Sequence, residues 1–220
     1  MKTTLKTTIA SLVLTSLATC VASAAVVVSS SFQTGTHTYV VSSTDLINAL
    51  PPTSSSGSFS IDGTSGATVL TNGVFPTSGG AGRFTAGGNA QGTSVTYTLP
   101  TAASIASIDV FGGWADGGRD QQSFSVLYAT SIDPTIFLPL ATVNFNPTPA
   151  PTGLVATQST ISENVTGILA TDVKALRFNF NATENGWSGY AEFDVHEVPE
   201  PSAALLGGLG LLGLLIRRRK

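Results

Sequence analysis

Short runs of alternating apolar and polar residues fill the middle of the chain, and they constrain its fold more than any other feature. A strand places successive side chains on opposite faces, so a period of two marks one buried and one polar face. The clearest run spans residues 173–180, where Leu176, Phe178 and Phe180 share one face and polar side chains share the other. Further runs cover residues 93–99, 105–111, 123–128 and 190–195.

Turn signals separate these runs, and long amphipathic helical patterns are absent from the middle of the sequence. Asn72-Gly73, Asp116-Gly117-Gly118 and Asn185-Gly186 are typical turn sequences. Many short strands with such turns predict an all-β fold, an antiparallel β-sandwich or jelly roll. We expect residues 50–60 and 147–151, which are rich in Pro, Ser or Gly, to form loops.

The last run, residues 190–195, predicts one further strand. Ala191, Phe193 and Val195 alternate there with Glu192 and Asp194. A period of two predicts that the three apolar residues face inward and the two carboxylates lie on the opposite face.

The N-terminus has the order of a secretory signal peptide. Lys2 and Lys6 precede an apolar stretch over residues 9–21, and Ala22-Ser23-Ala24 provides a small-residue cleavage site. We predict a signal peptide over residues 1–24, removed by signal peptidase, with a mature chain from Ala25. Cys20 is the only cysteine, so the exported domain has no disulfide.

The C-terminus ends in three parts that suit a membrane. Pro199-Glu200-Pro201-Ser202 is followed by the apolar run Ala203 to Ile216 and then by Arg217, Arg218, Arg219 and Lys220. As a helix the run would span roughly 21 Å, short of a bilayer core of about 30 Å. We expect a single transmembrane helix that anchors the chain briefly before processing.

These three parts closely resemble the PEP-CTERM sorting signal of Gram-negative bacteria. The resemblance implies that exosortase, a membrane-embedded protease-transpeptidase, recognises Pro199, Glu200 and Pro201 as the sorting motif. It also implies that Arg217 to Arg219 stop transfer through the inner membrane, and that the product reaches the cell surface or the medium. The alternative is an ordinary C-terminal anchor with an incidental Pro-Glu-Pro.

The two terminal signals hold most of the positive charge. Residues 25–198 contain only Arg83, Arg119, Lys174 and Arg177 against twelve Asp and Glu residues. This acidic balance argues against nucleic acid or an anionic membrane surface as a partner and is compatible with cations or neutral sugars. We divide the chain into the signal peptide, an N-terminal strand with a Ser/Pro-rich loop over 25–57, a sandwich over 58–197, and the sorting signal over 198–220.

The central block resembles galactose-binding-like, discoidin-type domains. The resemblance rests on Leu70-Thr71-Asn72-Gly73-Val74 and on the closing run from Trp187 to Val195, with the other strands between them in order. Such domains typically bind carbohydrate and are not catalytic. They often hold a structural calcium, and Asn72 and Glu192 occupy the matching positions. The alternative is that Asn72 serves a turn and Glu192 faces solvent.

Aromatic and arginine side chains near the turns are candidates for sugar contact. Trp114, Arg119, Trp187 and Tyr190 offer ring faces and hydrogen-bond donors of the kind that sugars bind. The alternative is that both tryptophans fill the core or its rim.

No pattern of catalytic residues supports an enzyme. The only histidines, His37 and His196, lie far apart, and no nucleophile elbow or glycosidase carboxylate pair is evident. We therefore expect a non-enzymatic surface protein that binds exopolysaccharide or another matrix component. One alternative is a structural surface or biofilm protein without a small ligand, and a second is a secreted polysaccharide hydrolase.

Overall fold

The computed structural model describes residues 25–57, 59, 66–77, 85–87, 93–115, 118–147, 153–181 and 187–199. The predicted signal peptide lies outside the described residues, and so does the sorting signal beyond Pro199. No helix within these ranges is both long and apolar enough to cross a membrane.

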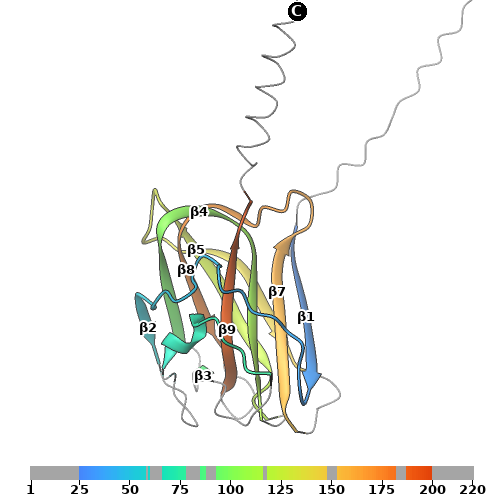
Figure 1. The fold of residues 1–220 in the computed structure, drawn as a ribbon. Helices are drawn as coiled ribbons and strands as arrows, with labels where there is room; N and C mark the ends of the chain where they lie inside the picture. Colours follow the sequence, from blue (N-terminus) through green and yellow to red (C-terminus); the bar gives the residue numbers. More distant parts are fainter. Residues whose placement is uncertain are drawn as a thin grey trace, which may run out of the picture.

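Antiparallel strands make up most of the described chain, which confirms the predicted all-β class (Figure 1). In chain order the elements are β1 (Val26–Thr34), β2 (Ser54–Ser56), the 3₁₀ turn η1 (Ala67–Thr71), β3 (Thr85–Gly87), β4 (Thr93–Trp114), β5 (Gln122–Thr130), β6 (Leu138–Phe145), β7 (Val155–Glu163), β8 (Ala170–Phe180) and β9 (Ser188–Glu197). The segment expected to be a loop over residues 50–60 contains the short strand β2, which pairs with β4.

The long strand β4 belongs to both halves of the sheet. Its first part, residues 93–98, pairs with β2 and β8, and β5 and β6 continue that layer. Its second part pairs with β7 on one side and β9 on the other, and β1 and β3 extend that layer. Figure 1 shows β4 arching over between the two parts. The sheet therefore folds back on itself as two layers.

Pro100 lies in the arch of β4, where the pairing register with β8 shifts. Proline lacks the N–H that a ladder needs, so it fits an exposed corner where no ladder bond is required. Lys174 Nζ closes this corner by donating to Leu99 O at 2.7 Å and to Pro100 O at 2.9 Å. The sequence runs at 93–99 and 105–111 are therefore one bent strand rather than two.

The main core fills the space between the layers. The apolar faces predicted for residues 93–99, 123–128 and 173–180 contribute to it. Phe178 of one layer and Phe193 of the other are both fully buried, with ring centroids 4.6 Å apart. This contact across the layers shows that the period-two faces do point toward a shared interior.

A second apolar cluster covers the outer face of the β9–β4–β7 layer. Phe75, Phe111 and Trp114 belong to it, and Tyr39 packs on its rim. The segment between β1 and β2 crosses this face in Figure 1, and Leu46 N donates to Val195 O at 2.9 Å. Residues that face outward on β9 are therefore covered by chain rather than exposed.

The strand β9 departs from the predicted alternation. Phe193 and Val195 join the main core as expected, but Ala191 lies in the outer cluster and Tyr190 lies in the core. The pairing of β4 with β9 shifts register here, between the pairs that contain Phe111 and Gly112. Such a bulge moves the following side chain to the other face.

Candidate functional site

The β9–β4–β7 layer has two ends, which we call the distal pole and the tail pole. The distal pole is the end where β4 finishes at Trp114 and β9 begins at Ser188. The tail pole is the opposite end, where β9 finishes and Val198 and Pro199 follow (Figure 1). Ten residues of strand separate the poles by roughly 30 Å.

Three of the four residues predicted to contact sugar meet at the distal pole. Trp114 is 4% exposed, and the Arg119 guanidinium carbon lies 5.0 Å from the centre of its ring. A guanidinium at this distance over an indole is held by cation–π attraction. Trp187 is half-buried and packs against the cluster that contains Trp114. Gly189 N donates to Arg119 O at 2.9 Å, which fixes the backbone of the arginine.

Glycine makes the close approach of β9 to Trp114 possible. A Cβ atom on Gly189 would lie 1.9 Å from Gly113 O and 2.5 Å from Trp114 Cε3. Gly113 itself has a φ of 128°, a conformation that side chains disfavour. Glycine at positions 113 and 189 therefore allows β4 and the Trp114 indole to approach β9 closely.

Tyr190 lies apart from this group, in the main core. Its side chain is 0% exposed, and its ring centroid lies 4.7 Å from that of Phe180. Burial raises the pKa of its phenol above the usual range. Since no part of the side chain reaches the surface, we leave Tyr190 out of the site proposed below.

Asn72 and Glu192, the predicted calcium ligands, meet at one backbone amide. Val74 N donates to Asn72 Oδ1 at 2.9 Å and to Glu192 Oε2 at 3.3 Å, and Gly73 N donates to the same Glu192 oxygen at 3.0 Å. Asn72 therefore closes the Asn-Gly turn, as the alternative interpretation expected. The same interpretation expected Glu192 to face solvent, and this part is wrong because Glu192 is 0% exposed.

Two more carboxylates lie close by, Asp194 on β9 and Asp45 on the segment between β1 and β2 that covers this strand. Asp194 Oδ2 accepts from Ser42 N at 2.6 Å, and Asp45 Oδ1 accepts from Val195 N at 3.2 Å. Glu192 Oε1, Asp194 Oδ1 and Asp45 Oδ2 are buried without a hydrogen-bond partner among the described residues. We call Asp45, Glu192 and Asp194 the carboxylate row.

Burial and mutual repulsion set the charge state of the row. Burial, followed by the nearby charges of Asp194 and Asp45, raises the pKa of Glu192 to about 8. Burial, with a smaller contribution from Asp45, raises the pKa of Asp194 to about 6. At neutral pH Glu192 is therefore mostly a neutral acid, whose proton reduces the cost of burying an unpaired oxygen.

The geometry fits a hydrogen-bonded turn better than a calcium site. Calcium needs six to eight oxygen ligands, yet Asn72 Oδ1 and Glu192 Oε2 already accept backbone N–H groups. Within the described ranges no group of three or more His, Cys, Asp or Glu side chains is arranged to hold a metal ion. Calcium binding stays a prediction, and no step of the proposed function depends on it.

The sequence analysis did not predict that Asp45 and Asp194 are buried together with Glu192. Asp45 lies far from Glu192 in the chain and carries no local motif, so only the fold brings them together. The proximity of Glu192 and Asp194 was visible as a two-residue spacing, but their burial depends on the segment that covers β9.

The sorting motif is described only at its first residue. Val198 N donates to Ser104 O at 2.8 Å, so Pro199 follows β9 directly beside the arch of β4. Glu200, Pro201 and Arg217 to Arg219 lie outside the described residues.

Solved structures similar to the chain include an F5/8 type C domain and family 32 carbohydrate-binding modules. The F5/8 type C domain of a Bacteroides fragilis protein has 17% sequence identity and a TM-score of 0.40, covering 60% of this chain and 80% of that one. The family 32 carbohydrate-binding module of Clostridium perfringens NanJ, solved with galactose, has 12% identity and a TM-score of 0.43, covering 76% and 92%. Another Clostridium perfringens module, solved with GalNAc-β-1,3-galactose, has 11% identity and a TM-score of 0.43, covering 77% and 94%.

Comparison with sequences identifies the tail. No curated protein matches the chain. One family description does match, the PEP-CTERM protein-sorting motif, over residues 197–220. The predicted resemblance of the C-terminus to this motif is thereby confirmed, and the chain carries a PEP-CTERM protein-sorting motif that begins at the last residue of β9.

Proposed function

We propose that this chain is an exported, non-enzymatic surface protein whose galactose-binding-like sandwich binds carbohydrate at the distal pole. The observation that carries the proposal is the stacking of Arg119 on Trp114 beside the half-buried Trp187. The half-buried Trp187 side chain and the Arg119 guanidinium offer a sugar an apolar surface and hydrogen-bond donors, and the buried Trp114 ring holds the guanidinium in place. This group lies at the opposite end of β9 from the sorting motif, so a tethered domain would present it away from the membrane.

The sorting part of the proposal concerns the two ends of the chain. Signal peptidase would release the N-terminus near Ala25, and exosortase would act at the Pro-Glu-Pro motif after transient anchoring in the inner membrane. Mass spectrometry of the protein from its native host tests both steps. A C-terminus within Pro199 to Ser202 is the expected result, and an intact Arg217 to Lys220 on protein from the cell surface would contradict processing.

A polysaccharide pull-down with matched arginine variants tests the binding part. Arg119→Ala removes the stacked guanidinium at the distal pole, whereas Arg177→Ala removes one that lies 3.8 Å from the centre of the Phe137 ring, on the other layer. Loss of charge-assisted hydrogen bonds of about 1.5–3 kcal/mol would weaken binding about tenfold or more for Arg119→Ala only.

Trp187→Ala provides a second test at the same pole, and its thermal unfolding shows whether the variant remains folded. Equal binding by wild type, Arg119→Ala and Trp187→Ala would reject the distal pole as the site. No binding of any glycan, combined with a loss of cell aggregation when the gene is deleted, would favour the purely structural role instead. Release of reducing ends from a polysaccharide would favour the hydrolase.

A further inference from the structure

Exposed apolar side chains gather at the tail pole. The described residues contain ten exposed large hydrophobic side chains, and eight of these lie on three segments that end or turn at this pole. They are Val26, Val27 and Val28 at the start of β1, Ile132, Ile136 and Leu138 between β5 and β6, and Val165 and Ile168 between β7 and β8. Figure 1 shows these turns beside the arch of β4 and the end of β9. Ile132 is the most exposed of them, at 90%. A group of exposed apolar side chains on one surface marks an interaction site.

Hydrogen bonds fix each of the three segments to a neighbouring segment or strand. Ala25 N donates to Asn164 Oδ1 at 3.1 Å, which joins the start of β1 to the β7–β8 turn. Ser131 Oγ donates to Asp172 Oδ1 at 2.6 Å, which joins the β5–β6 turn to β8. Leu169 N donates to Ile105 O at 2.8 Å, on the arch of β4. The exposed apolar side chains therefore lie on turns that hydrogen bonds connect to the sheet, rather than on independent loops.

The charges at this pole are mainly negative. Asp133, Glu163, Asp172 and Glu197 lie on its turns and strand ends, and Lys174 Nζ donates to backbone carbonyls of the arch. Hydrogen bonds led by the Thr166 side chain lower the pKa of Glu163 to about 2, so it stays ionised. Repulsion between these carboxylates and anionic lipid disfavours a negatively charged surface, whereas zwitterionic headgroups carry no such penalty.

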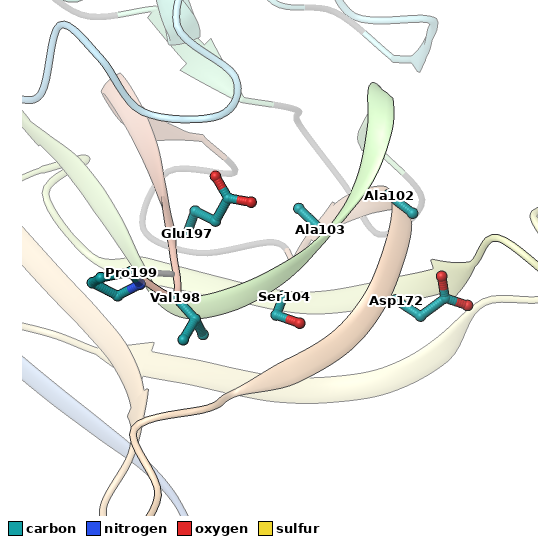
Figure 2. A pocket seen from close by; sticks show the side chains of 7 residues that line it. All are labelled: Ala102, Ala103, Ser104, Asp172, Glu197, Val198 and Pro199. Atoms are coloured by element: carbon teal, nitrogen blue, oxygen red, sulfur yellow. The ribbon is translucent and has the colours of Figure 1, made fainter. Parts of the chain in front are cut away.

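The chain leaves this pole from a fixed point close to its apolar tail. Figure 2 shows Pro199 beside Val198 and Ser104, lining a cavity of about 330 Å³ at the arch. The apolar run begins at Ala203, only four residues further along the sequence. Four fully extended residues reach at most about 14 Å, so a tail in the bilayer holds the pole at the headgroup layer.

We propose that, before the tail is processed, the tail pole docks on the surface of a zwitterionic lipid bilayer through Ile132, Ile136, Val165 and Ile168. This inference rests on the proposed membrane insertion of the sorting tail. The short tether supplies the proximity, and apolar side chains among the headgroups supply the contact. Docking holds the β9 axis steep to the membrane and turns the distal pole outward.

Fluorescence quenching in vesicles tests this orientation on residues 25–220, the chain that remains after the predicted removal of the signal peptide and that contains no cysteine. An environment-sensitive dye is attached at Ile132→Cys or at the control Val40→Cys. Val40 is 85% exposed and follows Tyr39, which packs near Phe111. The protein is reconstituted into phosphatidylcholine vesicles that carry a quencher at headgroup depth. Docking predicts strong quenching at position 132 and little at position 40.

A polar variant separates docking from tail insertion. With Ile136→Ser, Val165→Ser and Ile168→Ser combined, the chain should still float with the vesicles but lose most of the quenching at position 132. Circular dichroism confirms that the variant is folded. Flotation with equal quenching at positions 132 and 40 would overturn docking alone, as would shielding of position 132 only when exosortase is added. Failure to float would overturn membrane insertion by the tail and docking with it.

Discussion

Replacing Glu192 with glutamine should change how the stability of the domain depends on pH. The Glu192 carboxyl is buried, its pKa is raised from 4.5 to about 8, and its Oε2 atom accepts from two backbone amides. Glutamine can accept the same two hydrogen bonds through its amide oxygen, and it does not titrate. The substitution therefore removes the ionisation while preserving the turn.

The direction follows from linkage between protonation and folding. Because the folded-state pKa is the higher one, the native state holds the proton more tightly than the unfolded state. The stabilisation is complete below pH 4.5 and is lost as the pH rises through about 8. At about 1.36 kcal/mol per pKa unit, the loss is at most about 5 kcal/mol, and relaxation around the charge should reduce it to about 2–4 kcal/mol.

Chemical denaturation of wild type and Glu192→Gln between pH 4 and 9 measures the effect. The difference in unfolding free energy isolates position 192, since other carboxyls titrate in both proteins. Between pH 5 and 8, the unfolding free energy of Glu192→Gln should rise steadily relative to that of the wild type. Glu163→Gln is the control, because that half-buried carboxylate has a lowered pKa and its substitution should not raise the unfolding free energy relative to wild type over this range. A pH-independent difference between Glu192→Gln and wild type would refute the reasoning.

The same titration with calcium tests the predicted metal site. A cation bound by Glu192 would favour the ionised form and restore wild-type stability at pH 8–9. It would leave Glu192→Gln unchanged. Identical curves with and without calcium would remove the predicted calcium site.

Three further substitutions test the packing. Gly189→Ala should cost about 1–3 kcal/mol and shift tryptophan fluorescence, because the added methyl meets Trp114 and backbone; an unchanged spectrum would contradict this. Phe178→Ala should cost about 3–5 kcal/mol in urea unfolding, since Phe178 joins the two layers; a loss below 1 kcal/mol, about the cost of a surface change, would argue against that role. Lys174→Met should cost about 1–2 kcal/mol and speed hydrogen exchange in the β4 arch, where it frees two carbonyls; unchanged exchange would show that the lysine is dispensable there.

Local patterns predicted the strands well where one face meets one core. From Leu176 to Phe180 the sequence alternates without interruption, and its apolar residues are buried as expected. The sequence could not show that the strand containing Pro100 continues through its bend, because proline usually ends a strand. The strand can continue because Pro100 lies at an exposed corner, where Lys174 donates hydrogen bonds to the backbone carbonyls.

The candidate site was predictable only in part, for a related reason. Trp114 and Arg119 are five residues apart and lie on either side of a turn, so their stacking follows from local geometry. The burial of Glu192 depends on a segment about 150 residues earlier in the chain, through contacts such as Ser42 N to Asp194 Oδ2. No pattern within β9 indicates that another segment covers its outer face. The alternation therefore predicted that these carboxylates face away from the core, but it did not predict that they are buried.

The antiparallel pairing of β4 with β9 has a mechanical consequence. β4 ends at Trp114 and β9 ends beside Pro199, so the two strand ends point in opposite directions. A force between a ligand at Trp114 and an anchor after Pro199 therefore slides the strands past each other and loads their hydrogen bonds together, since these bonds lie across the strand direction. Pulling on β4 and β9 at the same end of the pair would instead break their hydrogen bonds one after another. The proposed tether and the candidate binding site therefore lie at ends of β9 and β4 from which pulling loads the hydrogen bonds of this pair in shear.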